Sequence, residues 1–176
     1  MRKLLNEELE RLSIREYKEA SKVPVVVVLD NVRSQHNIGS VFRTADAFRL
    51  EGLILCGITA TPPHREIHKT ALGATESVSW EYREHTVDAI RELKEKGFRI
   101  LSVEQAEGAV SLERMKLEPG VQYALVLGHE IRGVHQEVVN LSDQCIEIPQ
   151  FGTKHSLNIS VAAGIVIWEV FRQLPI

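Results

Sequence analysis

Aromatic residues are scarce in this chain: phenylalanine, tryptophan and tyrosine together make up 6% of its 176 residues. Hydrophobic residues still account for 44%, which is enough for one domain with a sizeable, mainly aliphatic core. No stretch is apolar for the length that a bilayer-spanning helix needs. The N-terminal sequence MRKLLNEELERL also lacks the apolar run of a signal peptide. We therefore expect a single-domain cytoplasmic protein that does not span a membrane.

Metal-binding and disulfide patterns are missing as well. Cys56 and Cys145 are far apart and belong to no partner motif, so reduced thiols are expected. The histidines lack the spacing of metal ligands, and neither an HExxH helix nor a GxSxG elbow occurs. The sequence predicts no metal site and gives little support to a hydrolase.

An excess of positive charge is also absent. The chain has 21 lysines and arginines against 24 acidic residues, a net charge of −3 and a pI near 6.2. That balance argues against a uniformly basic nucleic-acid-binding protein but permits a local basic patch. No GxxxxGK[ST] phosphate loop occurs, so another nucleotide-binding α/β enzyme is the weakest of the functions considered.

Short apolar runs alternate with helical patterns along the chain. The run from Val25 to Leu29 is continuous and β-branched, which is typical of a strand buried on both faces of a parallel sheet. Strands are predicted at 25–29, 53–56, 78–82, 98–103, 121–127 and 145–148. Helices are predicted at 3–20, 38–48, 66–72, 86–96 and 134–139, with a last one starting near Ser156. The pattern predicts an α/β domain over residues 23–176, with a mostly parallel sheet flanked by helices, preceded by a helical extension over residues 1–22.

Three polar loops follow predicted strands, at residues 30–37, 128–133 and 149–158. Ligands in parallel α/β sheets bind beyond the carboxyl ends of strands, so these loops are predicted to form one site. Ser156 could be a helix N-cap or could hold a ligand at the helix N-terminus.

Individual residues in these loops leave alternatives open. Asn37 could position a ligand or cap the helix that it begins. Arg43 on the same helix could face inward and clamp a phosphate, or lie on the surface. Gly39 permits close approach by another backbone or a ligand, and Glu130 could pair with Arg43, orient a substrate group or face solvent.

The three loops carry a resemblance to the SpoU/TrmH family of RNA ribose 2′-O-methyltransferases, in the SPOUT superfamily. The family pattern N-x-G-x-x-x-R-T-A is met by Asn37, Gly39, Arg43, Thr44 and Ala45. An apolar strand ending in G-x-E-x-x-G is met by Gly128, Glu130 and Gly133. The pattern I-P-x-x-G-x-x-x-S-L-N-x-S-x-A is met by Ile148, Pro149, Gly152, Ser156, Leu157, Asn158, Ser160 and Ala162. The resemblance covers about residues 23–174.

This resemblance implies a SPOUT-like fold with a C-terminal trefoil knot, a homodimer, and S-adenosyl-L-methionine (S-adenosylmethionine) as cofactor. The cofactor would lie against the knot loops, near Val103, Glu104, Leu127, Gly128, Gly133, Ile148, Ser156 and Leu157. The implied catalytic residues are Asn37, Arg43, Glu130 and Asn158, and the dimer would form through the last helix and the first motif.

The implied reaction is methyl transfer to a ribose 2′-hydroxyl of RNA, with tRNA and a D-loop guanosine favoured. An rRNA substrate and a non-catalytic RNA-binding role are the alternatives. Arg43 is expected to bind phosphate and stabilise the forming alkoxide, because a guanidinium holds its proton. His36 is a further candidate base. Gln150 stands where the family commonly has methionine, and neither it nor Lys154 is assigned a role.

Overall fold

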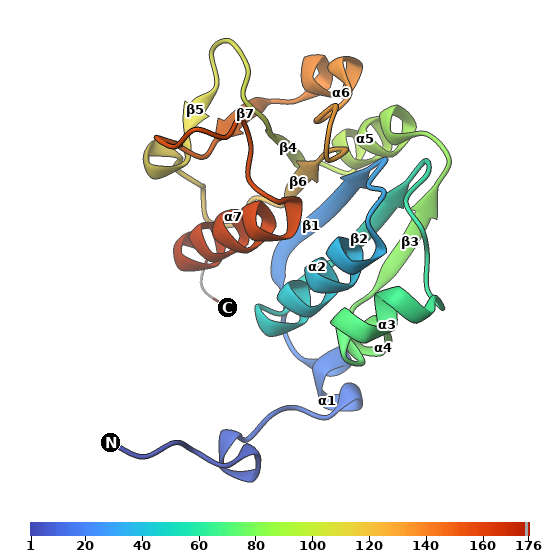
Figure 1. The fold of residues 1–176 in the computed structure, drawn as a ribbon, viewed down its shortest axis with the longest axis vertical. Coiled ribbons are helices and arrows are strands. Elements are labelled where there is room, and N and C mark those ends of the chain that lie inside the picture. Colours follow the sequence, from blue (N-terminus) through green and yellow to red (C-terminus); the bar gives the residue numbers. More distant parts are fainter. Residues whose placement is uncertain (175) are drawn as a thin grey trace.

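The computed structural model describes residues 1–174 and 176 of the chain. At its centre is a seven-stranded sheet with the order β3-β2-β1-β6-β4-β7-β5, in which every strand pair is parallel (Figure 1). The strands are β1 (Val23–Asp30), β2 (Leu50–Cys56), β3 (Trp80–Arg83), β4 (Arg99–Val103), β5 (Val110–Ser111), β6 (Tyr123–Leu127) and β7 (Gln144–Glu147). The prediction of an α/β domain with a mostly parallel sheet is confirmed.

The strand β1 is buried on both of its faces, as its β-branched sequence predicts. Val25, Val27 and Leu29 belong to one hydrophobic cluster. The alternate residues Val26 and Val28 belong to another on the opposite side. Because successive side chains of a strand point to opposite faces, one apolar run can serve two cores.

Helices cover both faces of the sheet (Figure 1). One core contains residues of α2 (Gln35–Ala47), α3 (Arg65–Ala71), α4 (Ala74–Ser77) and α7 (Ile159–Gln173). The opposite core contains residues of α5 (Thr86–Glu95) and α6 (Gln136–Leu141). The helix α4, the strand β5 and the 3-10 turn η2 (Leu112–Arg114) were not predicted from the sequence.

Two helix starts differ from the prediction, and side-chain caps explain both. The helix α2 begins at Gln35, because the Ser34 side chain caps it by accepting from the Asn37 N–H. Asn37 is therefore within the first turn and is not the cap. The helix α7 begins at Ile159, where Asn158 is the N-cap and accepts from the Ser160 N–H. Of the two roles that the sequence left open for Ser156, the structure excludes the N-cap.

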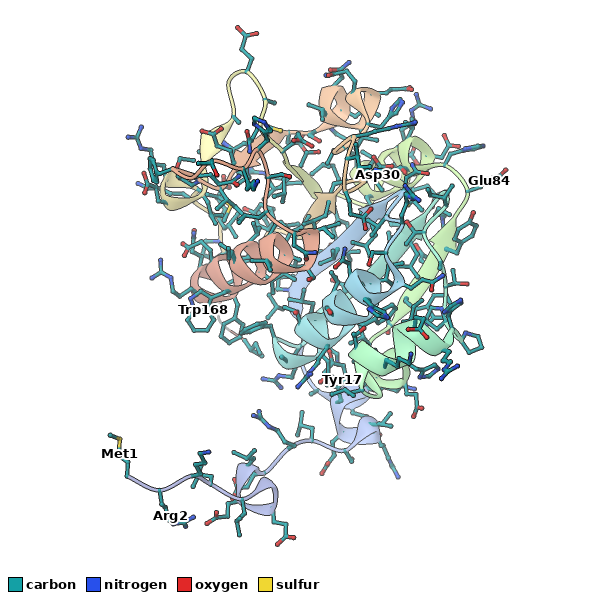
Figure 2. The ribbon with its side chains drawn as sticks, viewed as in Figure 1. Met1, Arg2, Tyr17, Asp30, Glu84 and Trp168 are labelled. Atoms are coloured by element: carbon teal, nitrogen blue, oxygen red, sulfur yellow. The ribbon has the colours of Figure 1, made fainter. Side chains whose placement is uncertain are left out.

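The predicted helix at residues 3–20 is also wrong in its extent. The segment forms only a 3-10 turn, η1 (Asn6–Leu9), and the short helix α1 (Ile14–Glu19). Figures 1 and 2 show the first residues extending away from the sheet, with Met1 and Arg2 far from it. Leu4, Leu5 and Leu12 are exposed, whereas Tyr17 is buried against the domain. Without a packing surface for its leucines, a short amphipathic segment has too little stabilisation to stay helical.

Candidate functional site

A pocket of about 480 Å³ lies at the carboxyl ends of β4, β6 and β7. Such a volume is in the range of small-molecule sites. All seven residues predicted to hold the cofactor line it: Val103, Leu127, Gly128, Gly133, Ile148, Ser156 and Leu157. The predicted convergence of the loops 128–133 and 149–158 on one site is confirmed.

The loop from Gly128 to Gly133 closes tightly on itself. His129 and Gly133 exchange backbone hydrogen bonds of 3.0 and 2.8 Å. A Cβ at Gly128 would lie 2.1 Å from the carbonyl carbon of Gly133, and Gly133 has a positive φ of 67°. Both positions of the G-x-E-x-x-G pattern therefore require glycine, one for space and one for conformation.

Two carboxylates accept hydrogen bonds from the backbone just beyond this loop. The sequence analysis did not predict this role for either side chain. Glu104 Oε2 accepts a 2.8 Å hydrogen bond from the Val134 N–H. Asp30, which is 1% exposed, accepts from the His135 N–H at 2.8 Å and from the Thr86 hydroxyl at 2.6 Å. Only their positions directly at the ends of β4 and β1 could have signalled these roles. Together they fix the end of the loop relative to the sheet.

Glu130 connects the second loop to the first. Its carboxylate accepts hydrogen bonds from the Arg33 N–H at 3.1 Å, the Ser34 N–H at 2.9 Å and Asn37 Nδ2 at 3.2 Å. Partial burial raises the pKa of this carboxyl, but the hydrogen bonds to its charged form outweigh burial and leave the pKa below its ordinary value. Glu130 is thus ionised at neutral pH, and it contacts Asn37 rather than Arg43.

Asn37 and Asn158 extend this connection to the third loop. Asn37 is buried, and its Oδ1 accepts a 3.2 Å hydrogen bond from Asn158 Nδ2. Asn158 Oδ1 meanwhile accepts from the N–H and the hydroxyl of Ser160 at the start of α7. One chain of hydrogen bonds, Glu130 to Asn37 to Asn158, therefore joins all three motifs beside the pocket.

Arg43 lies outside this arrangement. It is exposed on α2 and is not among the residues that line the pocket, so of the two positions that the sequence left open for it, the structure shows the surface one. It lies six residues beyond Asn37, about 9 Å along the helix axis at the rise of an α-helix. His36 is also exposed, and its Nε2 lies 2.7 Å from Glu66 Oε2 on α3.

The third loop is held from the opposite side by Gln105. Its Nε2 donates a 2.8 Å hydrogen bond to the His155 carbonyl. Glu104 and Gln105 are adjacent at the end of β4, which lies between β6 and β7 in the sheet. The end of β4 thus anchors both pocket loops. Gln150 also lines the pocket, whereas Lys154 is exposed.

Residues 1–174 and 176 contain no cluster of histidine, cysteine, aspartate and glutamate suited to a metal ion. None of the helices they form has the length and apolar character for crossing a membrane.

Comparison with known proteins places this site in a family. The sequence model described as the SpoU rRNA Methylase family matches residues 24–168. A protein of Staphylococcus aureus named for the TrmH family of tRNA/rRNA methyltransferases is 34% identical over 160 residues. That alignment covers 91% of this chain and 63% of the relative, so the chain spans less than two thirds of the relative's length. The tRNA (guanosine(18)-2′-O)-methyltransferase of Aquifex aeolicus is 33% identical over 172 residues, covering 97% of this chain and 78% of the relative.

Solved structures agree with the sequence relatives. The TrmH/SpoU tRNA-modifying enzyme of A. aeolicus has a TM-score of 0.80 at 30% identity, covering 91% of this chain and 80% of that one. An AdoMet-bound rRNA methyltransferase from Sinorhizobium meliloti also has a TM-score of 0.80, at 28% identity, covering 89% of this chain and 59% of that one. Because the family model matches most of its length and a hydrogen-bond chain joins its three motifs beside the pocket, the chain belongs to the SpoU rRNA methylase family.

Proposed function

We propose that this protein transfers a methyl group from S-adenosylmethionine to a ribose 2′-hydroxyl of RNA. The observation that carries the proposal is the hydrogen-bond chain from Glu130 through Asn37 to Asn158 beside the pocket. The names of the relatives support it, since the A. aeolicus protein is named as a 2′-O-methyltransferase and the S. meliloti structure holds AdoMet. An RNA substrate of this kind favours a cytoplasmic enzyme.

The pocket suits S-adenosylmethionine by its chemistry. Apolar side chains of Leu127, Ile148 and Leu157 offer walls for an adenine ring. The loops 128–133 and 155–158 bring backbone N–H and C=O groups to the same space, and such groups can read the edges of a base without a charged ligand. When bound, this cofactor supplies a methyl group on a sulfonium, which is already activated for transfer.

The chain's own residues must then orient the acceptor ribose and stabilise its oxygen. We assign orientation to Asn37, Glu130 and Asn158, because their hydrogen bonds fix one another next to the pocket. Arg43 is assigned to a substrate phosphate, since its exposed guanidinium is free to reach RNA.

His36 remains the candidate proton acceptor, with Glu66 orienting its ring.

We further propose a homodimer formed through α7. Val161, Ile165 and Trp168 are 50%, 38% and 52% exposed, and they recur at helical spacing on one face. Trp168 lies at the outer edge of the molecule in Figure 2. An apolar face of this kind on a helix that packs beside α2 is suited to a second copy of the chain.

The C-terminal trefoil knot is also proposed. It is supported by the sheet order, which inserts β4 between β6 and β7, and by the loops 128–133 and 149–158 that meet around the end of β4. An experimental chain trace through residues 128–174 tests it directly.

The substrate is proposed to be tRNA, with rRNA as the second candidate because the S. aureus relatives are named for both. Incubation with radiolabelled S-adenosylmethionine and total RNA, followed by mapping of the labelled nucleotide, tests activity, RNA class and position together. Label at a ribose 2′-oxygen of tRNA is the expected result. Binding of the cofactor without transfer to any cellular RNA would favour the non-catalytic role.

The Arg43→Ala variant tests the role given to this arginine. It is expected to bind S-adenosylmethionine normally, because Arg43 lies outside the pocket, and to lose most methyl transfer, because the proposed contact with a substrate phosphate is removed. Transfer by the variant at the normal rate would show that Arg43 has no such role.

A further inference from the structure

Beside the site, three basic side chains surround a single carboxylate. Glu66 on α3 lies 2.7 Å from His36, 2.7 Å from Lys69 and 4.0 Å from Arg65. All three partners are largely exposed, with side-chain exposures of 60%, 51% and 85% respectively. His68 is exposed on the same helix. We name Arg65, His68 and Lys69 of α3, together with His36 of α2, the α3 basic cluster.

The charge balance here differs from that of other ion pairs in the described part of the chain. Arg83 faces both Glu81 and Glu92, and Arg91 faces Asp88 and Glu137. In the α3 basic cluster one carboxylate instead faces two cations, Arg65 and Lys69, together with the His36 ring. The hydrogen bond from His36, followed by that from Lys69, lowers the pKa of Glu66, so its single negative charge is present at neutral pH. The cluster keeps an excess of positive charge on a chain whose net charge is −3.

The cluster is fixed relative to the site. His36 directly precedes Asn37, whose amide is part of the hydrogen-bond chain at the pocket. The helices α2 and α3 meet closely at Gly39, where a Cβ would lie 2.3 Å from the Ile67 carbonyl oxygen. The Thr70 hydroxyl also donates to the His36 carbonyl at 3.0 Å. In Figure 1, α3 lies on the side of α2 away from α7.

We propose that the α3 basic cluster binds the phosphate backbone of the RNA substrate next to the nucleotide that enters the site. This inference rests on the proposed function for the choice of RNA as partner. Exposed arginine and lysine side chains form charge-assisted hydrogen bonds with phosphate oxygens, which hold a polynucleotide in place without reading its sequence. An RNA backbone that follows α3 reaches the first turn of α2, which contains Asn37 of the hydrogen-bond chain at the pocket.

The test measures binding of fluorescently labelled bulk tRNA at a series of salt concentrations. For Arg65→Gln/Lys69→Gln we expect roughly tenfold weaker binding and a salt dependence shallower by about 1 to 2 units of slope, as for the loss of one or two phosphate contacts. Glu66→Gln is expected to act in the opposite direction and tighten binding, because it removes the one negative charge of the cluster.

The matched control is Arg91→Gln/Lys96→Gln, which removes the same charge from α5 and its C-cap residue on the opposite face of the sheet. It is expected to bind tRNA as the unmodified protein does. An equal effect in this control, an unchanged slope in Arg65→Gln/Lys69→Gln, or no binding of tRNA by the unmodified protein would each overturn the inference. Methyl transfer is measured separately: if the cluster variants weaken tRNA binding but the unmodified protein methylates no RNA, the proposed function fails while the binding surface stands.

Discussion

Glu130 accepts hydrogen bonds from two backbone N–H groups in the segment between β1 and α2, and from the side-chain amide of Asn37 in the first turn of α2. In Glu130→Gln one acceptor oxygen becomes an NH2 group that faces a donor. We expect a loss of about 1–2 kcal/mol in the free energy of unfolding and a fall of about tenfold or more in methyl transfer, equivalent to about 1.4 kcal/mol in the barrier. Denaturant titration and initial rates measure the two effects.

The control for that variant is Glu137→Gln on α6. Glu137 is exposed and pairs with Arg91, far from the pocket residues. Surface ion pairs contribute little, so stability is expected to change by less than about 0.5 kcal/mol. If both variants behaved alike, Glu130 would not have the ordering role described.

The same carboxylate makes a prediction about pH. Because the pKa of Glu130 is lower in the folded protein, its stabilising effect is fully present above its unfolded-state pKa of about 4.3 and is lost as the pH falls through the folded-state pKa. The stability difference between the unmodified protein and Glu130→Gln is therefore expected to be constant from about pH 7 to about pH 5 and to shrink in more acidic solution. Unfolding by denaturant across this range measures it, and a difference that persists undiminished at about pH 2 would contradict it.

At the scale of the element, the packing of α2 on α3 depends on Gly39. A Cβ there would lie 2.1 Å from the Thr70 hydroxyl oxygen and 2.3 Å from the Ile67 carbonyl oxygen. The second of these is backbone and cannot rotate away. Gly39→Ala is expected to destabilise the protein by about 1–3 kcal/mol, because the strain exceeds the roughly 1 kcal/mol that alanine gains in a helix.

Ser40→Ala is the matched control in the same helix. The Ser40 hydroxyl donates only within the helix, to the His36 carbonyl, so its loss is expected to change the free energy of unfolding by less than about 0.5 kcal/mol. Thermal or denaturant unfolding compares the two. A Gly39→Ala protein as stable as Ser40→Ala would show that α2 and α3 can separate without cost.

At the scale of the whole molecule, the exposed face of α7 predicts the oligomeric state. The unmodified chain of 19.8 kDa is expected to elute with twice that mass in size-exclusion chromatography with light scattering. Val161→Glu/Ile165→Glu is expected to give monomers, because two buried, unpaired carboxylates at an apolar interface are strongly unfavourable. Ile58→Glu, at a 63% exposed position in the loop after β2, is the control that stays dimeric. A monomeric unmodified protein would rule out the interface.

The sequence alone predicted the elements whose signal is local. The β-branched run at Val25–Leu29 indicates a strand buried on both faces, and the helical spacing of apolar residues indicates α2 and α5. The order of polar loops after strands also indicated the site, because parallel strands place their carboxyl ends at one edge. All seven predicted cofactor-binding residues line the pocket for this reason.

Other features depend on contacts between distant parts of the chain, and only the tertiary structure decided them. Glu130 contacts Asn37 and not Arg43, since the segment between β1 and α2 presents its N–H groups to Glu130 while Arg43 lies farther along α2. Glu104 and Asp30 hold the end of the loop 128–133 by accepting hydrogen bonds from the N–H groups of Val134 and His135, which are distant in the sequence. The leucines of residues 3–12 have helical spacing but no surface to pack on, and so do not form the predicted helix. The spacing of residues along the sequence determined which of them could meet, and the packing of distant segments around the sheet determined which of them do.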